Sequence, residues 1–174
     1  MINAQHIILI GFMGAGKSTI GKELARQLHY PFMDVDEEIV RQERRTIPEI
    51  FKTGGETFFR QIESEVFANL VQNKERSVIA TGGGIILLEQ NRSILKRHQT
   101  ILLEASLDTL FKRVSKQQQD RPLLKTDSDM KSKMEVLYNE RLLLYHESAK
   151  YIIQTDGKSI DTIVEEIRSC IELP

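Results

Sequence analysis

Residues 11–19 read GFMGAGKST, which matches the pattern G-x-x-x-x-G-K-[ST] at every required position. A short apolar run precedes this segment and an amphipathic stretch follows it, so the context is a strand, a loop and the start of a helix. Glycines let consecutive backbone N–H groups turn inward around an anion, and the positive end of the helix dipole points to the same place. The alternative is a glycine-rich turn with a chance Lys-Ser pair, but the flanking elements favour a phosphate-binding loop.

The side chains of this loop predict how a nucleotide is held. Lys17 supplies a point charge for the outer phosphates, the Ser18 hydroxyl is suited to bind Mg²⁺, and Thr19 adds a phosphate contact. The other nucleotide-binding positions expected in the loop are Gly14, Ala15 and Gly16. Residues 73–76 (Asn-Lys-Glu-Arg) come closest to the guanine-reading pattern [NT]-K-x-D but end in arginine. ATP is therefore the expected nucleotide, and a small-molecule kinase is the natural interpretation of a short chain.

Outward from the loop, short apolar runs alternate with amphipathic stretches. The runs lack the alternation of a half-exposed strand, so we expect strands that are covered on both faces of a parallel sheet. The expected strands are Ile7–Ile10, Phe32–Val35, Val78–Ala80, Ile101–Leu103 and Tyr151–Ile153. Apolar residues at helical spacing follow, as in Ile20, Leu24 and Leu28. The alternation predicts an α/β fold with right-handed crossovers.

Composition narrows the class of protein. The 174 residues suit one domain, which we expect to span 1–174. With 24 basic and 25 acidic residues the net charge is −1, so the basic surface expected of a nucleic-acid-binding protein is absent. The lone Cys170 excludes an intrachain disulfide and fits the reducing cytoplasm. No apolar run approaches the ~18 residues of a membrane span, and the start of the chain does not read as a signal peptide.

Two carboxylates follow the second apolar run. Asp34 and Asp36 are two residues apart, so on a strand they would project from the same face at its carboxyl end, where ligands bind in open α/β sheets. One carboxylate would hold water around a metal ion, and the other would accept a hydrogen bond from an acceptor hydroxyl and take its proton. The alternative makes Asp36 the N-cap of a helix that begins at Glu37.

Together these segments resemble the shikimate kinase family, from residue 7 to about residue 170. The matching motifs, in order and spacing, are residues 11–19, Asp34-Val35-Asp36, residues 55–60 (GETFFR), Thr81-Gly82-Gly83-Gly84, Arg121-Pro122-Leu123-Leu124 and Glu140-Arg141. The fold that the resemblance implies is that of nucleoside monophosphate kinases. It is a five-stranded parallel sheet of order 2-3-1-4-5, flanked by helices, with a mobile lid. We expect the lid at about 115–129 and the acceptor-binding region at about 37–62.

The resemblance also implies an activity and roles for single residues. The activity is ATP-dependent phosphorylation of the 3-hydroxyl of shikimate by a monomer, with Mg²⁺, on the route to aromatic amino acids. On the acceptor side, the implied ligands are Asp36 as base, Arg60 and Arg141 for the carboxylate, and Gly82 and Gly83 in a second glycine loop with Gly84. Glu63 would orient Arg60. On the nucleotide side, Asp34 would contact Mg²⁺ through water, Arg113 would stack on adenine, and Arg121 would reach the transferring phosphate from the lid.

The residues themselves support some of these roles and leave others open. On a helix from about Met130 to His146, Arg141 falls in the middle of an apolar stripe with Met134 and Tyr145. A guanidinium in that place needs an anionic partner, which is either a ligand carboxylate or an internal Asp or Glu, unless the side chain snorkels to water. Arg60 with Glu63 at i+3 reads, taken alone, as an exposed ion pair.

The remaining motifs have ordinary alternatives. Three glycines at 82–84 allow close backbone approach to a ligand, or form a plain tight turn. Arg121 lies in a polar segment, where an arginine is usually just solvated. Leu143 stands where many family members carry proline, which leaves the end of that helix in question. The four histidines, His6, His29, His98 and His146, show no metal-ligand spacing and are interpreted as structural or solvated. The rival functions are another kinase of the same fold, for gluconate or a nucleoside monophosphate, or a non-catalytic nucleotide-binding regulator.

Overall fold

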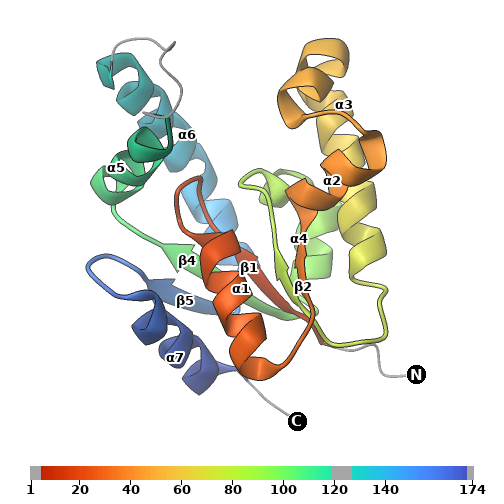
Figure 1. The fold of residues 1–174 in the computed structure, drawn as a ribbon. Coiled ribbons are helices and arrows are strands. Elements are labelled where there is room, and N and C mark those ends of the chain that lie inside the picture. The colour runs from red at the N-terminus through yellow and green to blue at the C-terminus, as the bar shows by residue number, and fades with distance from the viewer. Residues whose placement is uncertain (1–4, 119–126, 172–174) are drawn as a thin grey trace.

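One parallel sheet organises the chain in the computed structural model, which describes residues 5–118 and 127–171. The strands in the described residues are β1 (Ile7–Ile10), β2 (Phe32–Asp34), β3 (Val78–Ala80), β4 (Gln99–Glu104) and β5 (Tyr151–Gln154). Their order across the sheet is β2-β3-β1-β4-β5, and every neighbouring pair is parallel (Figure 1). The predicted fold class and strand order are confirmed.

Helices connect the strands and cover both faces of the sheet. In the described part they are α1 (Lys17–Leu28), α2 (Val35–Glu43), α3 (Ile47–Leu70), α4 (Glu89–Leu95), α5 (Leu107–Gln118), α6 (Asp127–Ser148), α7 (Ile160–Cys170) and a short 3₁₀ helix, η1 (Ile85–Leu87). Helices α1 and α7 lie together on one face, while α3, α4 and α6 lie behind the sheet (Figure 1). Beyond the carboxyl ends of the strands, α2 and α3 rise on one side and α5 and α6 on the other. Within residues 5–118 and 127–171, every helix is too short or too polar to cross a membrane.

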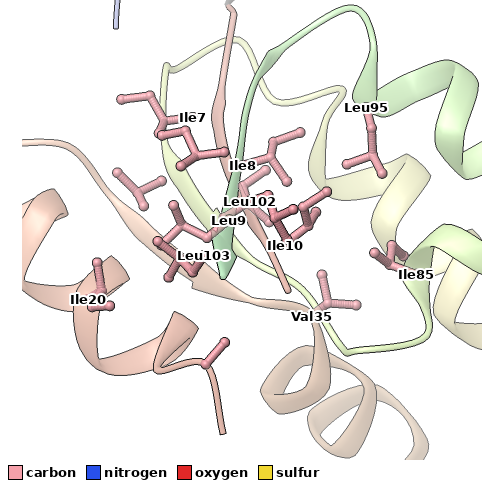
Figure 2. Packing of buried hydrophobic residues seen from close by; sticks show 14 of the residues in the cluster. Ile7, Ile8, Leu9, Ile10, Ile20, Val35, Ile85, Leu95, Leu102 and Leu103 are labelled. Atoms are coloured by element: carbon pink, nitrogen blue, oxygen red, sulfur yellow. The ribbon is translucent and has the colours of Figure 1, made fainter. Parts of the chain in front are cut away.

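The core lies between the central strands and the helices on either side. All four residues of β1, Ile7–Ile10, are fully buried, and they contact side chains of β4 such as Leu102 and Leu103 (Figure 2). Each aliphatic side chain buried in this way contributes about 1.5–3 kcal/mol to folding. The core therefore holds the end of β1, and with it the phosphate loop, at a fixed place on the carboxyl edge of the sheet.

Local signals set the ends of the helices that border this edge. The Asp34 carboxylate caps α2 by accepting the backbone N–H groups of Asp36 (3.0 Å) and Glu37 (3.3 Å). Thr46 and Glu49 form a capping box at the start of α3. Gly55, with φ 74° and ψ −178°, interrupts α3 and bends it, a conformation that side-chain-bearing residues avoid.

Three expectations about elements need correction. Val35, expected to end the second strand, is the first residue of α2, because the Asp34 cap starts the helix there. The helix expected at about 130–146 runs from Asp127 to Ser148 and continues through the exposed Leu143, whose backbone N–H proline would lack. The ends of the segment 115–129, expected as a mobile lid, are helical and belong to α5 and α6; residues 119–126 lie outside the described part.

Two histidines join elements at the opposite, amino-terminal edge of the sheet. The backbone N–H of His6 donates to Nδ1 of His98 (3.2 Å), and the backbone N–H of Ser77 donates to Nδ1 of His6 (3.3 Å). His6 Nε2 contacts the carbonyl of Val71 (3.2 Å). Because both Nδ1 atoms accept, both rings are neutral with their proton on Nε2. Burial lowers the pKa of both rings, that of His98 to about 4. These two histidines are structural.

Candidate active site

The phosphate loop lies between β1 and α1 and presents unpaired N–H groups. Gly14 (φ 80°) and Gly16 (φ 91°) have left-handed backbone angles, which turn the chain around a small hollow. Gly16 is the N-cap of α1, and no side chain caps this helix. The first N–H groups of α1 are thus open to an anionic ligand, and the helix dipole favours negative charge there.

Lys17 is held against the loop by two backbone carbonyls. Its ammonium donates to the oxygens of Gly11 (2.7 Å) and Phe12 (3.0 Å). Enclosure of the ammonium lowers the pKa of Lys17 to about 8, against the opposing effect of the Asp36 and Asp34 carboxylates. Phosphate oxygens in the hollow would restore a strong preference for the charged form, because they bring anionic partners to a desolvated cation.

Ser18 and Asp34 form an oxygen pair suited to a hard cation. The Ser18 hydroxyl, in the first turn of α1, donates to Asp34 Oδ2 at the end of β2 (2.6 Å). Mg²⁺ prefers oxygen ligands, keeps several of its waters, and typically uses one or two carboxylates together with phosphate oxygens. One hydroxyl and one carboxylate beside an open phosphate-binding loop fit that requirement.

The Asp34 and Asp36 carboxylates lie near Lys17, but they do not both belong to a strand, as was expected. Asp34 ends β2, whereas Asp36 lies in the first turn of α2, so they do not project from one strand face. The alternative is wrong as well, because the N-cap of α2 is Asp34 and not Asp36. Burial, with the nearby Asp34 charge, raises the pKa of Asp36 above its usual range, against the effect of Lys17 and Arg60. A raised pKa improves a carboxylate as a proton acceptor near neutral pH.

A cavity of about 600 Å³ joins these groups to the second glycine loop. Its lining includes the phosphate loop from Met13 to Thr19, together with Asp36, Gly82, Gly83 and Arg113. Residues from four separate stretches of sequence therefore meet at one hollow on the carboxyl edge of the sheet. The volume suits a small-molecule ligand site.

Arg60 and Glu63 form a buried ion pair beside the second glycine loop. Arg60 Nη1 lies 2.6 Å from Glu63 Oε2, and the two side chains are only 13% and 1% exposed. The guanidinium also lies over the ring of Phe59, with Cζ 5.0 Å from the ring centroid. The expectation of an exposed pair is wrong, because the glycine loop covers this flank of α3; a Cβ placed on Gly84 would overlap the guanidinium. Burial raises the pKa of Glu63, although Arg60 opposes the shift.

Arg141 reaches the same loop from α6. Its Nη1 donates to the carbonyl of Gly83 (3.4 Å). Met134 and Tyr145 of the predicted stripe are buried, and Arg141 is half-buried between them. Within the described residues, no Asp or Glu forms an ion pair with Arg141.

Of the two arginines predicted on the nucleotide side, the structure describes Arg113 but not Arg121. Arg113 lies beside the phosphate loop on α5 and donates to the carbonyl of Gly14 (3.3 Å) and to the Thr155 hydroxyl (3.2 Å) and carbonyl (3.3 Å). It links the phosphate loop to the turn after β5, where Asp156 in turn accepts from Ser106 at the start of α5. Arg121 lies outside the described residues.

Other residues of the site were not predicted from the sequence. The cavity is also lined by Lys116, Lys158, Ile160 and Ile163. Lys158 follows β5, so the rule that ligands bind at the carboxyl ends of parallel strands was a usable signal for it. Tyr145 was placed in the helix stripe but was given no role, yet its hydroxyl donates to the carbonyl of Gly83.

The fold and this site define a class before any comparison is made. A parallel sheet of order 2-3-1-4-5, a phosphate loop after the central strand and a cavity that joins it to a second set of charged groups are the architecture of a P-loop kinase for small molecules.

Comparison with known proteins identifies the family. The family model "Shikimate kinase" matches residues 13–172. Shikimate kinase of Burkholderia thailandensis is 41% identical over 97% of this chain and 90% of its own length, and that of Francisella tularensis subsp. novicida is 42% identical over 96% and 94%. A solved structure of shikimate kinase from Acinetobacter baumannii in complex with shikimate has a TM-score of 0.86 at 36% identity, covering 95% of this chain and 92% of that one. The chain belongs to the shikimate kinase family.

Proposed function

We propose that this chain transfers the γ-phosphoryl group of ATP to the 3-hydroxyl of shikimate, giving shikimate 3-phosphate and ADP in the biosynthesis of aromatic amino acids. Family membership supports the activity, and a structurally similar relative was solved with shikimate. The observation that carries the proposal is that Asp36 lines the same cavity as Lys17 and Gly83, while Arg60 and Arg141 border the glycine loop from two sides.

On the nucleotide side, the phosphate loop binds the triphosphate through backbone N–H groups, with Lys17 and Thr19 on its oxygens. Ser18 would hold Mg²⁺ directly and Asp34 would hold it through water, roles that the 2.6 Å contact between the two side chains supports. Mg²⁺ bound there neutralises charge on the phosphates. Arg113 borders the nucleotide end of the cavity.

On the acceptor side, each charged group has a matching partner on shikimate. The planar forks of Arg60 and Arg141 bind the carboxylate, because a guanidinium pairs with a carboxylate through two parallel hydrogen bonds. The backbone of Gly82 and Gly83 lies against the ring. The Asp36 carboxylate accepts the hydrogen bond of the reacting hydroxyl and orients it towards the phosphate loop.

In the transfer, the 3-hydroxyl oxygen bonds to the γ-phosphorus as the bond from that phosphorus to the β,γ-bridging oxygen breaks. The hydroxyl proton passes to Asp36, and ADP carries the leaving oxygen. Lys17 stabilises charge on the transferring group. We assign Arg121 to a lid that adds positive charge and excludes water as a competing acceptor.

We further propose that residues 1–174 form one kinase domain, with the lid at about 115–129, which acts as a monomer in the cytoplasm. The proposed nucleotide and acceptor ligands all come from one chain, so the site does not require a second copy. The exposed thiol of Cys170 fits a reducing compartment.

The test is a measurement of ADP release from Mg-ATP with shikimate, gluconate or AMP as acceptor. Turnover that depends on shikimate, with the product identified as shikimate 3-phosphate, is the expected result. Stimulation by gluconate or AMP alone would favour a different kinase of this fold. ATP binding without turnover on any acceptor would favour the non-catalytic regulator.

A further inference from the structure

A buried phenol holds the second glycine loop from outside the loop. Tyr145 lies on α6, one turn after Arg141, and its side chain is 1% exposed. Its hydroxyl donates to the carbonyl oxygen of Gly83. Burial raises the pKa of Tyr145 further above its usual range, so the hydroxyl keeps its proton and remains a donor.

The loop has little else to fix that carbonyl. The carbonyls of Gly82 and Gly84 accept backbone N–H groups from the turn that follows them, from Ile85 (3.3 Å) and Leu87 (3.0 Å). The carbonyl of Gly83 instead receives its hydrogen bonds from α6. Glycines have no side chains to pack, so the position of the Gly83 peptide depends on these donors.

Two donors from α6 share this one acceptor. Arg141 Nη1 contacts the Gly83 oxygen at 3.4 Å, a long hydrogen bond beside the close contact of the Tyr145 hydroxyl. A substrate carboxylate would compete with that oxygen for the Arg141 guanidinium, because a charge-assisted pair is stronger than a bond to a neutral carbonyl. Once Arg141 turns to the carboxylate, Tyr145 is the donor that keeps Gly83 in place.

We propose that Tyr145 is a positioning residue for the acceptor site, whose hydroxyl fixes the Gly83 peptide and the starting orientation of Arg141 without touching the substrate. This inference rests on the proposed function. In this proposal, one hydroxyl group preorganises two contacts to shikimate, those of Gly83 and Arg141, which come from different elements. Preorganised contacts favour binding because less ordering is required when the ligand arrives.

The test is Tyr145→Phe, which removes the hydroxyl and keeps the ring in the core. We expect the KM for shikimate to rise about 5- to 20-fold, as loss of a hydrogen bond in a buried network does. The kcat should change less than about threefold and the KM for ATP less than about twofold. The matched control is Tyr138→Phe on the same helix, whose hydroxyl makes only a 3.5 Å contact with the Ala105 carbonyl. That variant should keep the wild-type KM for shikimate.

A merely structural role of the hydroxyl has a different signature. It predicts a lower melting temperature with an unchanged KM for shikimate, and that result would overturn the inference. Equal increases in both KM values would overturn it too. A titration of shikimate into the wild-type protein and Tyr145→Phe by calorimetry gives the same comparison without turnover. Wild-type protein that neither binds nor phosphorylates shikimate would instead reject the proposed function, and the role of Tyr145 with it.

Discussion

Replacing Gly84 with alanine should damage acceptor binding by moving a single side chain. The backbone at Gly84 has φ −100° and ψ 2°, angles that alanine can adopt, so the substitution introduces no backbone strain. The added methyl group would overlap Nη1, Cζ and Nη2 of Arg60. That guanidinium is paired with Glu63 at 2.6 Å and lies over Phe59, so it cannot move aside without losing those contacts.

The expected rise in the KM for shikimate follows from the hydrogen bonds that the displaced Arg60 would lose. Hydrogen bonds to charged groups contribute about 1.5–3 kcal/mol, which corresponds to a rise of about 10- to 150-fold in the KM for shikimate. Overpacking by one methyl group costs about 1–3 kcal/mol of folding free energy. This is less than the roughly 5–15 kcal/mol that a typical domain has, so the variant should fold and still bind ATP.

Steady-state ADP release, with shikimate and ATP varied in turn, measures both constants. Arg60→Ala and the double variant with Gly84→Ala complete a cycle, because alanine at position 84 has no guanidinium to displace once Arg60 is removed. The double variant should therefore be no worse than Arg60→Ala. At Gly83 an added Cβ would meet its nearest protein atoms at 3.6 Å, an ordinary contact, so Gly83→Ala should leave Arg60 in place. Full additivity in the cycle, or an unchanged KM in Gly84→Ala, would refute the reasoning.

Three further predictions concern other groups. Asp36→Asn should lower kcat at least about 100-fold while the KM for ATP stays within about twofold; equal effects on both would indicate a structural role instead. Arg141→Lys keeps the charge but not the fork, so the KM for shikimate should rise about tenfold with the KM for ATP unchanged; recovery of the wild-type value by lysine would argue against bidentate pairing. Folding lowers the pKa of His98 from 6.5 to about 4, so its contribution to stability is complete above pH 6.5 and is lost as the pH falls towards 4. Thermal melting from pH 7 to pH 4.5 should show a steeper fall for the wild type than for His98→Asn, and parallel curves would contradict this assignment.

Much of the fold could be predicted because local pattern and global architecture agree. The apolar run at Ile7–Ile10 is a fully buried central strand, as expected of a run with no polar alternation. The phosphate loop was predictable because the positive φ angles of Gly11 and Gly16 favour glycine at the two positions that the pattern fixes. The strand order came from the family resemblance, since periodicity does not say which strands are neighbours.

The acceptor side was less predictable, because its residues depend on tertiary neighbours. At the level of sequence, Arg60 and Glu63 are an ordinary i,i+3 pair on a polar helix flank. The structure buries this pair because the glycine loop covers that flank of α3, and the fact that residue 84 is a glycine makes room for the guanidinium. Similarly, nothing near Tyr145 in the sequence indicates that its hydroxyl contacts Gly83, since 62 residues separate them.

The carboxylate pair shows why alternatives weighed from sequence need not exclude each other. From the sequence, a helix cap at Asp36 was the alternative to a chemical role for the Asp34 and Asp36 carboxylates, but a carboxylate has two oxygens and can serve a cap and a ligand together. Asp34 uses Oδ1 to accept the N–H groups that start α2, while Oδ2 accepts the Ser18 hydroxyl on the side of the phosphate loop. The cap fixes the orientation of the Asp34 carboxylate, so Oδ2, the oxygen proposed to face Mg²⁺, is preorganised. The same cap places Asp36 in the first turn of α2. Substitution of Asp34 should therefore disturb the proposed base as well as the metal, whereas Asp36→Asn leaves the cap intact.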